Sequence, residues 1–282
     1  MSGVVLALGG GGARALAHVG VLEVLRRERI PVAGIAGTSM GALVGAMFAA
    51  GLPPAVMRED VQRVGRVWDL FRLVDVAIRP GSITLKGSKL TEFLAERVGL
   101  ELRIEALRMP FAAMAVDLSS GREVALRTGP VVDAVRASLS FPGLFEPVER
   151  DGLRLVDGGV LNNVPVDVAR GLVPGPVVAV DVLPAFGGNV PGQPPAVGPL
   201  RTPLATRWLD DLVQVQLAMV SELVEHRMAE APPDVVLRPK LPDDITVLTG
   251  FGRGDEAIRV GVEAAEASLD AIRTAVDSRV EA

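Results

Sequence analysis

The sequence predicts an α/β protein in which helices cover a mostly parallel central sheet. In the first half of the chain, short apolar runs alternate with amphipathic stretches, which is the order of strands and crossover helices. Glycine-rich turns follow the first two apolar runs. With 282 residues, 49% of them apolar, the chain is long enough for one large core.

The apolar runs and their periodicity define the predicted elements of the first half. Short runs between turn residues are typical of strands, and longer runs with one apolar face are typical of helices. The predicted strands are 4–8, 32–36, 111–117, 123–127, 153–156 and 177–182, and the predicted helices are 14–28, 40–50, 88–98 and 130–139. Ser88 precedes the apolar positions of its helix at the interval of an N-cap, so we expect it to cap that helix.

The second half predicts a long loop followed by helices. Residues 184–203 are rich in proline and glycine and predict an irregular loop, of the kind that often forms a lid or an entrance rim. Beyond it, we predict a helix over 204–231, a strand over 235–238 and a closing helix over 254–279. The expected organisation is a main domain over 3–182, a loop over 183–203 and a helical extension over 204–282 that packs on the same domain.

Charge and composition exclude several classes of protein. A net charge of −5 without a basic stripe predicts no binding to nucleic acid. The chain has no cysteine and only two histidines, so no metal site is expected. The N-terminus has no positive charge before its apolar run, and glycines and prolines divide the uncharged stretch 31–57. We therefore expect neither a signal peptide nor a membrane span, and favour a cytoplasmic protein that touches a membrane only peripherally.

The pentapeptide GTSMG at 37–41 lies between a predicted strand and a predicted helix, which is the context of a nucleophile elbow. In such a turn the central residue takes a strained backbone geometry, and the flanking glycines let strand and helix pass closely. Ser39 is then presented at the N-terminus of the helix, whose dipole favours negative charge. The alternative is a serine in a glycine-rich turn with no chemical role.

Four glycines at 9–12 stand between the first predicted strand and the first predicted helix. Backbone N–H groups of such a loop can point into a cavity and bind a phosphate or a developing oxyanion. A dinucleotide-binding fingerprint fits less well, because Ala15 replaces its third glycine and no acidic residue ends the second strand. The loop favours an oxyanion hole, and a nucleotide-binding module remains an alternative.

Asp157 follows the predicted strand at 153–156 and precedes two glycines. From an open turn at a strand end, its carboxylate can reach a serine on a neighbouring strand and accept its proton. The alternative is an ordinary Asx turn, for which Asp-Gly is a common signature. The amides of Asn162 and Asn163 either hold this turn or cap a helix that begins near Pro165, and we favour a structural role.

The two histidines are poor candidates for the base of a Ser-His-Asp triad. His18 shares the apolar side of its helix with Leu22 and Leu25, which favours a buried, hydrogen-bonded, structural histidine. His226 lies among charged residues of a predicted helix and is expected in solvent.

Four motifs follow one another in the first 165 residues: GGGGAR at 9–14, GTSMG at 37–41, ASLSFPGLF at 137–145 and DGGVLNNVP at 157–165. Together they resemble the patatin-like phospholipase family, in its bacterial group of small single-domain members. The resemblance covers most of residues 3–182 and extends weakly to FGRGDEAIRVG at 251–261. It implies a three-layer α/β/α hydrolase.

The resemblance also implies the roles of individual residues. Ser39 would be the nucleophile and Asp157 the general base of a Ser-Asp dyad. The oxyanion hole would fall on Gly10, Gly11 and Gly12, with Arg14 as a nearby orienting cation. Ala15 stands where the family usually has glycine, so helix and loop are expected slightly further apart.

The implied activity is hydrolysis of a lipid or fatty-acyl ester through an acyl-enzyme, with transient contact to a membrane surface and without a metal or organic cofactor. The alternative is a lipid-sensing or regulatory binding protein with a vestigial hydrolase site. The sequence leaves the headgroup, the acyl-chain length and the oligomeric state open.

Overall fold

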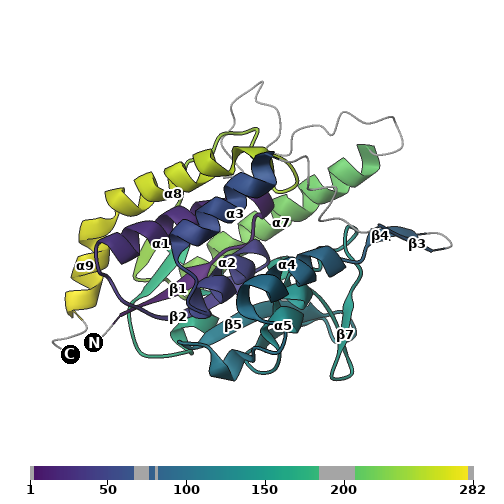
Figure 1. The fold of residues 1–282 in the computed structure, drawn as a ribbon, viewed down its shortest axis with the longest axis horizontal. Coiled ribbons are helices and arrows are strands. Elements are labelled where there is room, and N and C mark those ends of the chain that lie inside the picture. The colour runs from purple at the N-terminus through teal and green to yellow at the C-terminus, as the bar shows by residue number, and fades with distance from the viewer. Residues whose placement is uncertain (1–2, 67–75, 80–81, 184–206, 279–282) are drawn as a thin grey trace.

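The structure is a computed structural model that describes residues 3–66, 76–79, 82–183 and 207–278 (Figure 1). Its sheet strands are β1 (Val4–Leu8), β2 (Val32–Thr38), β5 (Phe111–Asp117), β6 (Arg122–Leu126), β7 (Val148–Arg150), β8 (Leu153–Asp157), β9 (Val177–Val180) and β10 (Val235–Leu237). A separate hairpin consists of β3 (Val76–Arg79) and β4 (Ser82–Leu85).

The α-helices of the described ranges are α1 (Ala17–Arg27), α2 (Met40–Ala49), α3 (Pro54–Arg66), α4 (Ser88–Val98), α5 (Val131–Ser138), α6 (Val166–Arg170), α7 (Arg207–Glu230), α8 (Gly254–Ala267) and α9 (Leu269–Ser278). Short 3-10 helices lie at Gly12–Leu16, Ile104–Ala106, Gly158–Val160 and Phe251–Arg253.

The sheet has the strand order β10-β9-β1-β2-β5-β8-β7, and β6 also pairs with β5. The strands from β10 to β5 are parallel to one another, whereas β6, β8 and β7 join antiparallel beyond β5. The predicted α/β class with a mostly parallel sheet is confirmed.

Side chains alternate between the two faces of each strand, and on β1, β5 and β9 both faces are buried. On β1, Val4, Leu6 and Leu8 belong to the core formed with α1, α2 and α8, whereas Val5 and Ala7 belong to the core formed with α6 and α7. The sheet therefore lies between two helical layers, and the three-layer α/β/α arrangement is confirmed.

The helix α8 lies directly against α1, because each helix has a glycine at the contact. A Cβ atom on Gly20 would lie 2.0 Å from the carbonyl oxygen of Ile258, and one on Gly261 would lie 2.0 Å from that of Ala17. Any larger residue at either position would push the helices apart. This close contact joins α8 to the helical layer that contains α1 and α2 (Figure 1).

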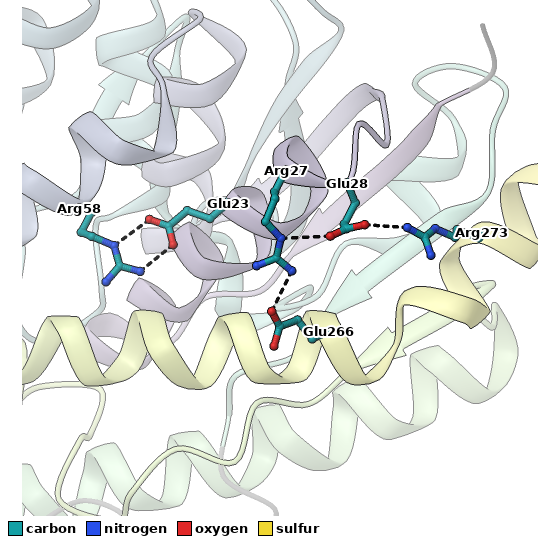
Figure 2. Close-up of polar contacts among 6 residues, drawn as sticks. All are labelled: Glu23, Arg27, Glu28, Arg58, Glu266 and Arg273. Carbon is teal, nitrogen blue, oxygen red and sulfur yellow. Dashed lines mark hydrogen bonds and ion pairs between the residues drawn. The ribbon is translucent and has the colours of Figure 1, made fainter.

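Ion pairs surround the same contact at the surface (Figure 2). Arg27–Glu266 and Glu23–Arg58 join α1 to α8 and to α3, and Glu28, the residue that follows α1, pairs with Arg273 of α9. Each ion pair that remains in contact with solvent contributes little to stability, so the buried packing between α1 and α8 contributes most of the stability of this contact.

Three predicted helices differ from the structure. The single helix predicted over 254–279 is two helices, because Ser268 leaves helical geometry at φ −106° and ψ 3°. Ser88 is not an N-cap but the first residue of α4; Gly87 precedes it in the left-handed region at φ 73°, where glycine is favoured. The helix predicted over 14–28 begins as a 3-10 turn at Gly12–Leu16.

Other elements were missed or were shorter than predicted. The strand predicted over 177–182 ends at Val180. The helix α3 was not predicted, although Pro54 at its first position is a common start signal. The short strands β3, β4 and β7 were also missed, because each is too short to show a period. The helix α6 begins at Val166, directly after Pro165, where the sequence indicated a helix start.

The uncharged stretch 31–57 divides into β2, α2 and the first turn of α3. Among the residues that the structure describes, no helix is both long and apolar enough to span a membrane. The loop predicted over 184–203 lies outside the described residues, and the helix predicted over 204–231 is described from Arg207 to Glu230.

Candidate active site

Ser39 occupies the sharp turn between β2 and α2 at φ 54° and ψ −125°. A positive φ is strained for a residue with a side chain and persists only where the surroundings enforce it. Here the backbone N–H of Ser39 donates to Ser138 Oγ at 2.9 Å, and Thr38 Oγ1 donates to the carbonyl of Asn162 at 2.9 Å. A Cβ atom on Gly41 would lie 2.3 Å from the Leu8 carbonyl oxygen, so this position must be glycine.

Asp157 lies at the end of the antiparallel strand β8, next to the Ser39 turn. On β5, Ala115 lies beside Asp157 and Met114 lies beside Thr38, so β8 ends level with the Ser39 turn. The Asp157 carboxylate is buried, and accepts hydrogen bonds from the Ser39 hydroxyl and, at 2.8 Å, from the Gly159 N–H. Burial raises its pKa to about 6, and the two hydrogen bonds oppose this shift.

The glycine loop faces both residues and offers backbone donors. The Gly10 N–H already donates to the Asn163 carbonyl at 3.3 Å. Within the described residues, the N–H groups of Gly11, Gly12 and Met40 have no hydrogen-bond partner, and all three residues line one cavity with Ser39. Met40 was not singled out from the sequence, although the residue after an elbow nucleophile commonly supplies such a donor.

Gly12 is the most constrained position of the loop. It has φ +54°, and a Cβ atom there would lie 1.7 Å from the Val247 carbonyl oxygen. Gly11 has an extended φ of 162°, and its Cβ would meet only a methyl group of Val182, at 2.7 Å.

Replacing these two glycines should therefore have different costs. We expect Gly12→Ala to lose about 3 kcal/mol or more of unfolding free energy, because the backbone at Val247 must move and the alanine keeps a strained positive φ. Gly11→Ala should lose about 1–2 kcal/mol, since a side chain can shift. Urea denaturation of both variants measures the difference, and equal stabilities would mean that the loop has another conformation.

Arg14 is buried and joins the glycine loop to two other segments. Its Nε donates to the Val182 carbonyl at 2.6 Å, and its Nη1 donates to the Ile245 carbonyl at 2.9 Å. The guanidinium thus orients backbone behind the loop, and Arg14 is not among the residues that line the cavity. A direct role for Arg14 beside an oxyanion stays a prediction.

The two histidines lie as the sequence predicted. His18 is fully buried, and its Nε2 lies 2.7 Å from the Gly9 carbonyl oxygen, which requires the proton on that nitrogen. Burial lowers its pKa to about 4, so it is neutral near pH 7. His226 has a 69% exposed side chain, and neither histidine lines the cavity with Ser39.

Beside Ser39 and Asp157 lies a cavity of about 460 Å³. Most of its walls are apolar, and one face of α2 follows it away from Ser39 through Met40, Leu43, Val44 and Met47. Helices α3, α4 and α7 contribute to the wall through Met57, Val61, Leu90, Phe93, Leu217 and Val220. This space suits an extended apolar chain whose polar end stops at Ser39.

A strained serine between strand and helix, a buried carboxylate that accepts its hydroxyl, and backbone donors beside an apolar cavity characterise α/β proteins with a nucleophile elbow. The chain belongs to the patatin-like phospholipase family, whose model matches residues 6–170. The resemblance inferred from the four motifs is confirmed.

The relatives include proteins much longer than this chain. An uncharacterized NTE family protein of Mycobacterium bovis is 35% identical over 216 residues, which cover 77% of this chain and 57% of the relative. Lysophospholipase nte1 of Neosartorya fischeri is 31% identical over 286 residues, covering 95% of this chain and 18% of the relative. The chain therefore corresponds to just over half of the first protein and less than a fifth of the second.

Among solved structures, the chain is similar in fold to the crystal structure of VipD from Legionella pneumophila. The TM-score is 0.53 at 13% sequence identity, and the match covers 98% of this chain and 67% of VipD. This likeness concerns the fold alone.

Proposed function

We propose that the protein is a lipid acyl hydrolase that cleaves carboxylic esters with a Ser39–Asp157 dyad. The observation that carries the proposal is the hydrogen bond from the strained Ser39 to the buried Asp157 at the wall of an apolar cavity. Membership of the patatin-like phospholipase family and similarity to a protein named lysophospholipase support the substrate class.

In the proposed acylation step, Ser39 Oγ attacks the ester carbonyl while its proton passes to Asp157. The N–H groups of Gly11, Gly12 and Met40 donate to the resulting oxyanion. When the intermediate collapses, the C–O bond to the leaving alcohol breaks, and the alcohol takes the proton from Asp157. An acyl-enzyme on Ser39 remains.

Deacylation repeats these steps with water. Asp157 accepts a proton from water as its oxygen attacks the acyl carbonyl, and returns that proton to Ser39 Oγ as the fatty acid leaves. A carboxyl group with a pKa of about 6 is mostly ionised at pH 7, and is still basic enough to accept a proton.

Acyl-chain length tests the proposal. Each methylene buried in the cavity can add up to about fourfold to kcat/KM, since its burial is worth ~0.8 kcal/mol. We expect decanoyl esters to exceed acetyl esters by at least about tenfold, measured with Ser39→Ala as the blank. A steady fall from acetyl to decanoyl would indicate a general carboxylesterase. A wild type that binds fatty acid but hydrolyses no ester would favour a lipid-sensing protein.

The proposal includes transient contact with a lipid surface. On the outer face of α7, Leu212, Val215 and Met219 are 50%, 57% and 68% exposed, whereas Leu217 and Val220 of its inner face line the cavity. No charge interrupts residues 212–221. A helix with this outer face is suited to the lipid interface from which the substrate comes. The decanoyl ester presented in vesicles should therefore be cleaved faster than in solution.

A further inference from the structure

Asn163 lies where the glycine loop meets the Asp157 turn. The residue is 5% exposed and lines the same cavity as Ser39. Its amide takes no part in the proton transfers proposed above, so its burial beside the reacting groups calls for another explanation.

Asn163 holds both polar groups of Gly10. The Gly10 N–H donates to the Asn163 carbonyl at 3.3 Å, and Asn163 Nδ2 donates back to the Gly10 carbonyl at 3.2 Å. The peptide groups on both sides of Gly10 are therefore fixed by one residue. The orientation of the Gly11 N–H follows, because it belongs to the same peptide group as the Gly10 carbonyl.

The same side chain also packs on the Asp157 turn. A Cβ atom on Gly10 would lie 2.7 Å from Asn163 Oδ1, and one on Gly159 would lie 2.8 Å from it. Gly159 is the residue whose N–H binds the Asp157 carboxylate at 2.8 Å. One amide thus fills the space between the loop with the free donors and the turn with the carboxylate.

We infer that Asn163 is a positioning residue, which sets the donors of the glycine loop at the correct place relative to Ser39 and Asp157. The inference rests on the proposed function. Asn163 acts through Gly10, so its loss leaves the nucleophile and the base in place but lets the donors move. Misplacement of reacting groups by about 1 Å costs up to ~10²-fold in rate, so a fall in kcat of about 10- to 100-fold is expected.

Asn162 provides the matched control. It is adjacent and fully buried, but its Nδ2 donates to Glu123 Oε2 and to Asp167 Oδ1, both at 2.9 Å. Both carboxylates pair with Arg227 of α7. The side chain of Asn162 therefore supports α7 and makes no hydrogen bond to Gly10 among the bonds of the described residues.

The experiment compares Asn163→Ala and Asn163→Ser with Asn162→Ala in thermal denaturation and in decanoyl ester hydrolysis. Both Asn163 variants should lose about 10- to 100-fold in kcat, with KM within about twofold of the wild type. Inhibition by a decanoyl trifluoromethyl ketone, which forms an oxyanion on the serine, should weaken by the same factor as kcat/KM. The pH midpoint of kcat/KM near 6 should not move, because the hydrogen bonds to the Asp157 carboxylate come from Ser39 and Gly159 and not from Asn163. Asn162→Ala should lose stability but keep kcat within about twofold.

Near-wild-type kcat in a folded Asn163 variant, or an equal loss in Asn162→Ala, would overturn the inference. If Asn163→Ala does not fold, Asn163→Ser, which keeps a small polar side chain, is compared with Asn162→Ala in its place. If neither Asn163 variant folds, a role limited to positioning is contradicted. Failure of the proposed function gives a different result, in which Ser39→Ala retains the hydrolysis seen in the wild type, or the wild type shows none.

Discussion

Ser39→Ala should abolish ester hydrolysis, with kcat lower by at least about three orders of magnitude. The substitution removes the nucleophile and the hydroxyl that donates to Asp157, while the backbone of the turn keeps its bond to Ser138. A fluorophosphonate probe should label the wild type and leave Ser39→Ala unlabelled, as measured by intact-protein mass spectrometry. Thermal stability should fall modestly, because the buried Asp157 carboxylate loses one hydrogen bond, whereas alanine at φ 54° bears the same backbone strain as serine.

Ser119→Ala is the matched control for labelling. Ser119 is exposed in the turn between β5 and β6, and its hydrogen bond to the Asp117 carboxylate comes from its backbone N–H, which alanine retains. This variant should be labelled and active like the wild type. Labelling of Ser39→Ala at the wild-type rate would show that another residue is the nucleophile.

Asp157→Asn should lower kcat by about 10²–10⁴-fold, which is the usual contribution of a general base. Asparagine keeps the shape of the side chain and an acceptor for the Gly159 N–H, so the turn should persist. In the wild type, kcat/KM should rise with pH through about 6, as Asp157 loses its proton, and stay level above. An inflection near 7 that disappears in a histidine variant would instead indicate a histidine base.

Asp157→Asn should also stabilise the fold at pH 8. The pKa of Asp157 is about 6 in the folded protein and 3.8 as its reference value, so ionisation opposes folding. The raised pKa of Asp157 contributes its full stabilisation of the fold below about pH 4, where the carboxyl is protonated, and this contribution is lost as the pH rises through 6. The full shift corresponds to roughly 3 kcal/mol, so urea denaturation should show a gain on the order of 2 kcal/mol at pH 8 and almost none at pH 4. A constant difference between these pH values would contradict the raised pKa.

The histidines serve as controls for the dyad. His18→Gln should lose about 1 kcal/mol or more, because the replacement satisfies the buried Gly9 carbonyl imperfectly, yet keep much of the activity when folded. His226→Gln should change neither property, since its side chain is exposed. A folded His18→Gln without activity, beside an active Asp157→Asn, would disprove the dyad.

The sequence by itself determined the fold class and singled out Ser39 and Asp157, which the structure brings together at one cavity. Short continuous apolar runs predicted the strands at 4–8 and 111–117 at their observed bounds, because a strand buried on both faces has apolar residues along its whole length. The elbow at Ser39 was visible because only glycine fits beside it, and glycine spacing is a local property. The structural nature of His18 followed from its place on the apolar face of its helix.

Other features depended on contacts between distant segments. That β8 runs antiparallel to β5, and so ends beside Ser39, is a matter of strand pairing that no local pattern encodes. The use of the Gly10 N–H by Asn163, and the burial that raises the pKa of Asp157, likewise arise only when separate loops meet. Hydrogen bonds and desolvation depend on distance in space, whereas sequence patterns report neighbours along the chain, so the geometry of the site was decided by the tertiary structure.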